Sequence, residues 1–206
     1  MGTPAIQNKR DERRDAIIDV ARACFLADGY AATSMSTIAA RVGGSKGTLY
    51  NYFRSKEELF AAVMDRQCVV LGETLFDAAG DGDELQDRLG QFVRGFLETL
   101  LSADSLALYR VVVGEAERFP ELGRTFYESG PRILLARIAA YLGEQMAQGR
   151  LRRADPQTAA EQLKDLALSG LHQKRLWNVI AAPSPQAVDA QVATAVDTFL
   201  RAYRPD

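Results

Sequence analysis

The segment VGGSKGTLYNYF, residues 42–53, carries the groups in this chain best suited to contact phosphate: glycines beside a lysine and several hydroxyls. A nucleotide-binding loop would need the order G-x-x-x-x-G-K-[ST] between a buried strand and a helix. Here Lys46 precedes Gly47, and the preceding STIAARV has a helical period. The segment is therefore interpreted as the bend between two short helices and not as a nucleotide loop.

Other catalytic chemistry finds little support. The chain has one histidine, His172, and two cysteines, Cys24 and Cys68, which form no C-x-x-C pair. No G-x-S-x-G or paired-carboxylate motif accompanies them. We therefore predict that the protein is not an enzyme, with no catalytic residue, metal site or cofactor, and we interpret the two cysteines as buried free thiols.

Composition and charge fit a folded protein with an uneven charge distribution. The sequence lacks an apolar run long enough to cross a membrane, and its polar N-terminus lacks the apolar core of a signal peptide. We expect a soluble cytoplasmic protein with no membrane partner. Residues 1–56 hold nine basic against five acidic residues, about +4, which leaves about −6 of the total −2 for the rest. The excess of basic residues in residues 1–56 is a weak indication of nucleic-acid binding.

Helical periodicity extends along almost the whole chain, which predicts an all-α fold. The first apolar stripe stops at Asp28–Gly29, and Ser34 to Ser36, Ser45 and Ser55 are placed to begin three further helices. Breaks follow at 80–83, 102–104, 119–120, 130–131, 155–156 and 183–185, and two long helices are expected to close the chain.

A helix-turn-helix needs a small residue in its first helix, a glycine near the turn and a second helix with a small or polar start. Ala39, Gly43 and SKGTLYNY meet these demands. The segment TSMSTIAARVGGSKGTLYNYFRSKEELF, residues 33–60, resembles the DNA-binding domain of TetR-family transcriptional regulators. VVVGEAERFPELGRTFYESGP, residues 111–131, is similar to regulatory domains of members that control efflux and related genes.

The resemblance implies a three-helix DNA-binding domain over residues 1–56 and a larger helical ligand-binding and dimerisation domain over 57–206. Lys46 and Thr48 are then expected to reach base edges, whereas Tyr50, Tyr52 and Lys56 would contact phosphate. Asn51 could read adenine or face solvent. The full expected DNA-binding set is Ser34, Ser36, Thr37, Ser45, Lys46, Gly47, Thr48, Tyr50, Asn51, Tyr52 and Lys56.

Gly44 departs from the family pattern, which usually has a β-branched or other apolar residue plugging this turn. Its lack of a side chain predicts a looser turn, so Gly44→Val is expected to raise the unfolding temperature unless the turn needs a positive φ. Arg13 and Arg14 on the first helix are interpreted mainly as solvated charges.

The resemblance implies two tasks for residues 57–206, dimerisation and ligand sensing. The expected partners are a second copy of the chain, double-stranded operator DNA, and an unidentified small lipophilic effector that releases a repressor from a palindrome. The dimer interface is assigned to Leu163, Leu166, Gly170, Val192, Val196 and Phe199, whose stripes could instead be core within one chain. The effector pocket is assigned to Phe76, Phe92, Phe96, Leu100, Tyr109, Val113, Glu115, Phe126, Tyr127, Arg137 and Tyr141. The alternative is a helical binding protein or enzyme that keeps the head as a scaffold.

Overall fold

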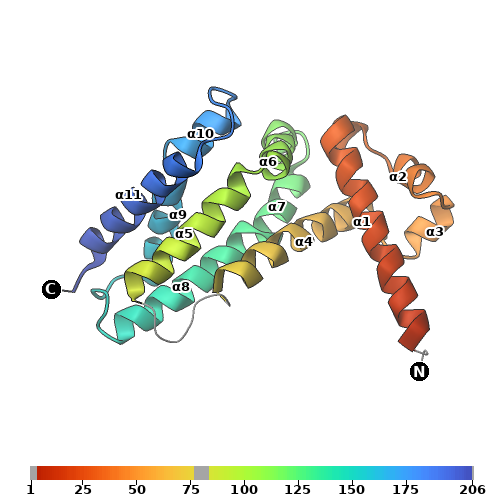
Figure 1. Ribbon diagram of the computed structural model, residues 1–206. Helices are drawn as coiled ribbons and strands as arrows, with labels where there is room; N and C mark the ends of the chain where they lie inside the picture. Colours follow the sequence, from red (N-terminus) through yellow and green to blue (C-terminus); the bar gives the residue numbers. More distant parts are fainter. Residues whose placement is uncertain (1–3, 77–83, 206) are drawn as a thin grey trace. The chain divides into compact units, whose positions relative to one another are not determined.

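The described part of the chain is helical throughout. A computed structural model describes residues 4–76 and 84–205, and the side chains of residues 8–66 and 84–205. These residues form helices without any strand, which confirms the predicted all-α fold (Figure 1). The helices are α1 (Pro4–Ala32), α2 (Met35–Val42), α3 (Lys46–Tyr50), α4 (Lys56–Phe76), α5 (Leu85–Leu101), α6 (Ala103–Glu115), α7 (Pro120–Ser129), α8 (Pro131–Ala147), α9 (Pro156–Leu168), α10 (Leu171–Leu176) and α11 (Pro185–Tyr203).

The chain packs as two compact units, whose boundaries differ from a single cut along the sequence. The first unit joins residues 1–67 to residues 107–130, so most of α6 and all of α7 pack with the N-terminal helices. The second unit joins residues 68–106 to 131–206. The expected division into DNA-binding and regulatory domains after residue 56 concerns function and stays a prediction.

In the first unit, hydroxyl side chains mark the helix starts, as predicted. Ser34 accepts a hydrogen bond from the backbone N–H of Thr37, and Ser45 accepts one from that of Thr48. Ser55 accepts from the N–H of Glu58, whose carboxylate in turn accepts from Arg54 N–H at 2.7 Å. These bonds satisfy donors that have no partner within the helix.

The regular part of α1 ends at the predicted Asp28–Gly29 stop. Gly29 adopts φ 80° and ψ 166°, a conformation that almost only glycine tolerates. The next residue, Tyr30, is fully buried, and its ring stacks on Phe25 and meets Phe60 and Phe119 edge to face. Gly29 therefore turns the chain so that the Tyr30 ring joins the core.

Glu115, the last residue of α6, binds the backbone at this turn. Both of its carboxylate oxygens accept from the N–H of Ala31, at 3.1 and 3.0 Å. A Cβ placed on Gly29 would lie 3.0 Å from Glu115 Oε1. The glycine thus permits both the backbone conformation and the close approach of this carboxylate.

In the second unit, α9 packs on α8, and α11 packs on both α5 and α9 (Figure 1). The apolar stripes of these helices meet in one core that includes Phe96, Leu142, Leu163 and Phe199. Burial of these stripes is the main source of stability available to the unit. No helix among the described residues has the length and apolar character needed to cross a membrane.

The chain closes with three helices, and not with the two that were predicted. Gly170 takes φ 78° and ψ −74°, which ends α9 and starts the short α10. The side-chain amide of Gln191 donates to the Leu166 carbonyl at 2.9 Å, so a carbonyl at the end of α9 has a partner. His172 on α10 is buried, which lowers the pKa of its imidazole, and Trp177 just beyond α10 is 67% exposed.

Most of the residues assigned to the dimer interface lie in the core of the second unit. Leu163, Val192, Val196 and Phe199 are buried within the chain's own core. An apolar stripe indicates that a face is covered, but not which chain covers it. Of the six assigned residues, only half-buried Leu166 and exposed Gly170 remain partly accessible.

We predict that Gly29→Ala lowers the free energy of unfolding by about 1–3 kcal/mol, because alanine is strained at this φ and its Cβ would crowd Glu115. Chemical denaturation measures the change. The matched control is Gly90→Ala in α5, where a Cβ would meet nothing within 4 Å. This control should gain about 0.5–1 kcal/mol from helix propensity. Equal changes in the free energy of unfolding at the two positions would contradict the requirement for glycine at position 29.

Candidate nucleic-acid interface

The α2–turn–α3 segment forms a compact helical hairpin in the first unit. Gly43 has φ 72° and ψ 39°, and its N–H donates to the Ala40 carbonyl. The N–H of Gly44 donates to the Ala39 carbonyl at 3.1 Å. These two bonds make a Schellman cap, which stops α2 and turns the chain into α3.

Helix α3 buries one side chain and exposes most of the others. Leu49 is 2% exposed and joins the core of the first unit. Lys46, Thr48 and Tyr50 are exposed, and the Lys46 ammonium lies 5.8 Å from the centroid of the Tyr50 ring. The buried leucine thus fixes a short helix whose outer surface offers a cation, a hydroxyl and a phenol.

Most of the expected DNA-binding residues are exposed on α2, on α3 or beside them. The exposed ones are Ser34, Ser36, Ser45, Lys46, Gly47, Thr48, Tyr50 and Asn51, whereas Thr37, Tyr52 and Lys56 are half-buried. Several of the hydroxyls already serve the helix caps, since Ser34 Oγ lies 2.9 Å from Thr37 Oγ1 and Ser45 Oγ lies 2.9 Å from Thr48 Oγ1. Thr48 therefore stands beside the cap of its own helix.

Lys56, which is expected to contact phosphate, also makes contacts within the first unit. Its ammonium donates to the Tyr30 carbonyl at 2.8 Å and lies 4.0 Å from the centroid of the Tyr30 ring. The Tyr30 hydroxyl donates to Glu57 at 3.2 Å. Lys56 thus ties the start of α4 to the end of α1, which makes its role in the first unit structural as well as electrostatic.

Two arginines that were interpreted mainly as solvated charges contact this hairpin or the residues just after it. Arg13 Nη2 donates to the Val42 carbonyl at 3.2 Å, and the Arg14 guanidinium lies 5.2 Å from the centroid of the Phe53 ring. Sequence reasoning missed these contacts because each joins distant positions. Arg13 and Val42 are 29 positions apart, and Arg14 and Phe53 are 39 positions apart. The presence of both arginines on the N-terminal half of α1 was the only available signal.

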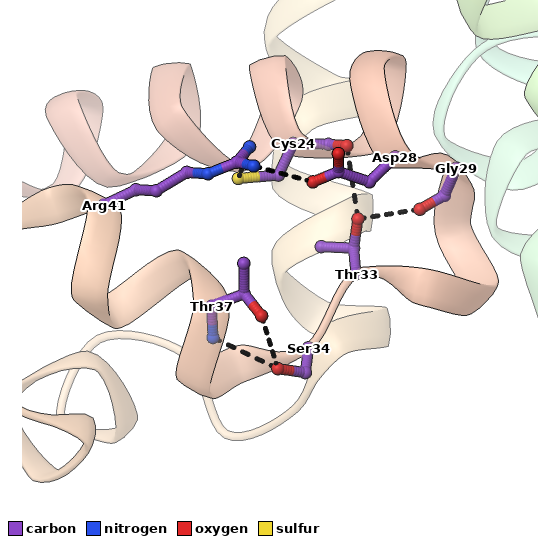
Figure 2. A network of polar contacts seen from close by, with 7 residues as sticks. All are labelled: Cys24, Asp28, Gly29, Thr33, Ser34, Thr37 and Arg41. Carbon is purple, nitrogen blue, oxygen red and sulfur yellow. Dashed lines mark hydrogen bonds and ion pairs between the residues drawn. The ribbon is translucent and has the colours of Figure 1, made fainter.

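A buried threonine links the end of α1 to the start of α2 (Figure 2). Thr33 is 2% exposed, and its hydroxyl donates to the Gly29 carbonyl at 2.7 Å, with the Cys24 carbonyl 3.2 Å away. Figure 2 shows Arg41 reaching back from α2 to α1, where it donates to Cys24 Sγ at 3.2 Å and pairs with Asp28 at 2.9 Å. Cys24 is a buried free thiol, as predicted, and Cys68 lies outside the described side chains.

The expected pocket residues of the first unit differ in burial and in contacts. The rings of Tyr109 and Phe126 meet edge to face at 6.0 Å between centroids. Val113 is 62% exposed and Tyr127 is 49% exposed. Glu115, expected to select the charge of an effector, accepts hydrogen bonds from the backbone N–H of Ala31. Tyr109 and Phe126 are therefore in ring contact within this group.

The expected pocket residues of the second unit lie mostly in its core. Phe92 and Phe96 are buried, with nearly parallel rings 6.0 Å apart between centroids. Leu100 and Tyr141 pack against the same core, whereas Arg137 is exposed. The side chain of Phe76, also expected in the pocket, lies outside the described residues.

Comparison with known proteins gives two family matches. Residues 17–63 match bacterial regulatory proteins of the tetR family, and residues 87–205 match the C-terminal domain of AefR-like transcriptional repressors. The first match contains α2, α3 and the turn between them. The matched families consist of transcriptional regulators and not of enzymes, which confirms the prediction against catalysis.

Individual relatives of the chain are also described as regulators. The flavonoid-responsive regulator FrrA is 34% identical, over 95% of this chain and 98% of that chain, with a TM-score of 0.80. A TetR-family regulator from Mesorhizobium loti MAFF303099 is 28% identical, over 94% of this chain and 98% of that chain, with a TM-score of 0.82. The transcriptional activator FasR of Mycolicibacterium smegmatis is 37% identical over 89 residues, which are 43% of this chain and 41% of FasR. The similarity thus spans less than half the length of FasR.

We predict that Thr33→Val lowers the free energy of unfolding by about 1–2 kcal/mol, because valine keeps the shape of the side chain but removes a buried donor from two carbonyls. Thermal unfolding followed by circular dichroism measures it. Thr194→Val is the control, since the Thr194 hydroxyl donates to the Ala190 carbonyl at an exposed site. A loss at Thr194 as large as that at Thr33 would contradict the structural role of Thr33.

Proposed function

This chain belongs to the TetR family of DNA-binding transcriptional regulators, and we propose that it represses transcription from a palindromic operator until a small lipophilic effector releases it. The match of residues 87–205 to the AefR-like repressors supports repression. The observation that carries the proposal is the exposed group of Lys46, Thr48 and Tyr50 on α3, a helix fixed by buried Leu49.

The chemistry of these side chains suits a DNA groove. A lysine donates to the O6 and N7 atoms of guanine, and a threonine can contact a base edge or the methyl group of thymine. Tyr50, 41% exposed, can donate its phenol to a phosphate, as can half-buried Tyr52. In this proposal Lys46 and Thr48 read the sequence, while the tyrosines and the exposed serines of α2 and its cap provide affinity and register.

A homodimer follows from the shortness of this code. One five-residue helix contacts too few bases to specify an operator, so two copies reading an inverted repeat are needed. Four of the expected interface residues are covered within the chain, so we propose that the second copy packs on other residues of 57–206. Leu166 and Gly170 remain candidates for it.

An aromatic effector is supported by the relative FrrA, described as flavonoid-responsive, and by the ring pair of Tyr109 and Phe126 between α6 and α7. The end of α6 holds the backbone of Ala31 through Glu115, and Ala31 lies three residues before Ser34, the cap of α2. A ligand that favours another position of α6 would shift the populations of the conformations that α2 and α3 adopt. Flavonoids are suitable first probes, and a compound that binds the chain while operator affinity stays unchanged would contradict this coupling.

Selection from a random duplex pool tests the proposal as a whole. We predict that the full chain enriches an inverted repeat whose half-sites are centred about 10 base pairs apart, one turn of DNA, or a multiple of this spacing. Affinity for the selected duplex should fall with salt, with a slope near −0.9 per phosphate contact. Enrichment of a single unrepeated motif would contradict the dimer, and no enrichment would contradict sequence-specific binding.

We predict that Lys46→Ala weakens binding to the selected duplex by about 1–3 kcal/mol and removes the preference for guanine at one position of each half-site. Fluorescence anisotropy with matched and single-base-substituted duplexes measures both effects. Lys174→Ala, which removes an exposed lysine from α10, is the control and should leave affinity and preference unchanged. If Lys46→Ala keeps the full guanine preference, Lys46 does not read the base.

A further inference from the structure

The turn between α2 and α3 contains Gly44, which has no side chain, and the side chain of Arg13 from α1 lies beside it. A Cβ built on Gly44 would lie 3.3 Å from Arg13 Nη2 and 3.9 Å from Thr48 Cβ. Gly44 does not have a positive φ, in contrast to Gly43 beside it, so the backbone itself does not demand glycine here. The space beside Gly44, and not its φ, explains why a larger residue would be poorly placed.

Arg13 also completes the cap of α2. The Schellman bonds of Gly43 and Gly44 satisfy the carbonyls of Ala40 and Ala39, and the carbonyl of Val42 receives Arg13 Nη2 at 3.2 Å. In a Schellman cap, the residue two positions after the helix commonly packs an apolar side chain against the last turn. That residue is Gly44, which has no side chain to pack.

We propose that Arg13 is the positioning residue of the α2–α3 turn, with its guanidinium taking the place of the side chain that Gly44 lacks. The proposal rests on the function proposed above, because a fixed turn matters there by orienting Lys46 and Thr48 for DNA. In this arrangement Arg13 and a large residue at position 44 are alternatives. A valine would contact the guanidinium and separate it from the Val42 carbonyl.

A double-mutant cycle on the full chain tests this mutual exclusion. The four proteins are the wild type, Arg13→Ala, Gly44→Val and the double variant, compared by thermal unfolding and by affinity for the selected duplex. Arg13→Ala should lower Tm by about 2–4 °C, the shift expected for loss of one part-buried hydrogen bond in a chain of this length. Arg10→Ala, an exposed arginine of the same helix, is the charge-matched control and should leave Tm unchanged.

The decisive result is a change of sign. Gly44→Val should lower Tm when Arg13 is present and raise it when Arg13 is alanine, because the valine then fills the vacated space and restricts the unfolded chain. Affinity should follow the same order, with about fivefold weaker binding for Arg13→Ala and recovery in the double variant. Equal Tm shifts of Gly44→Val in the two backgrounds would overturn the proposal.

Two further readouts separate the possible failures. If Arg13 acted by contacting DNA phosphate, Arg13→Ala would reduce the salt slope by about 0.9, and the double variant would not recover affinity. That result would overturn the positioning role. The Tm cycle needs no DNA, so a sign reversal in a chain that selects no duplex would reject the DNA-reading role while retaining the turn contact. Additive Tm shifts in a chain that binds its duplex would reject only the inference.

Discussion

The burial of Tyr30 organises the first unit, because one ring joins three segments that are distant in the sequence. Its faces and edges contact Phe25 of α1, Phe60 of α4 and Phe119 at the start of α7. A buried phenol and carbonyl would be costly without partners, but the hydroxyl donates to Glu57 and the carbonyl accepts from Lys56. Burial, with the neighbouring Glu57 carboxylate, raises the pKa of the Tyr30 phenol. The turn at Gly29 places this ring in the core.

Helix α3 illustrates how much a functional element owes to its surroundings. A helix of five residues is not stable by itself, because nucleation costs more than so few hydrogen bonds return. Its cap at Ser45, its buried Leu49 and the aromatic ring of Phe53 beneath Arg14 hold it in place. The residues proposed to read DNA are therefore held in place by contacts outside the helix and by its cap.

Local signals in the sequence predicted local structure well. Ser34, Gly43 and Ser45 mark the ends of α2 and α3 because capping depends on neighbours within four residues. Contacts between distant segments were beyond this reasoning: nothing near Glu115 or Arg13 indicates the backbone groups that they bind. The stripe of α11 was recognised, but its partner was not, because periodicity says only that a face is covered. The positions expected to contact DNA could thus be taken from the motif of residues 33–60. The contacts that hold them in place became evident only in the three-dimensional structure.

Trp177 gives the molecule a spectroscopic asymmetry. It is the single tryptophan of the chain and lies 67% exposed beyond α10 in the second unit, whereas residues 1–67 and 107–130 contain none. Indole emission shifts to shorter wavelength when water leaves the ring. Fluorescence excited at the red edge of protein absorption therefore observes the surface of the second unit alone, and the unit that carries α3 is silent under the same light.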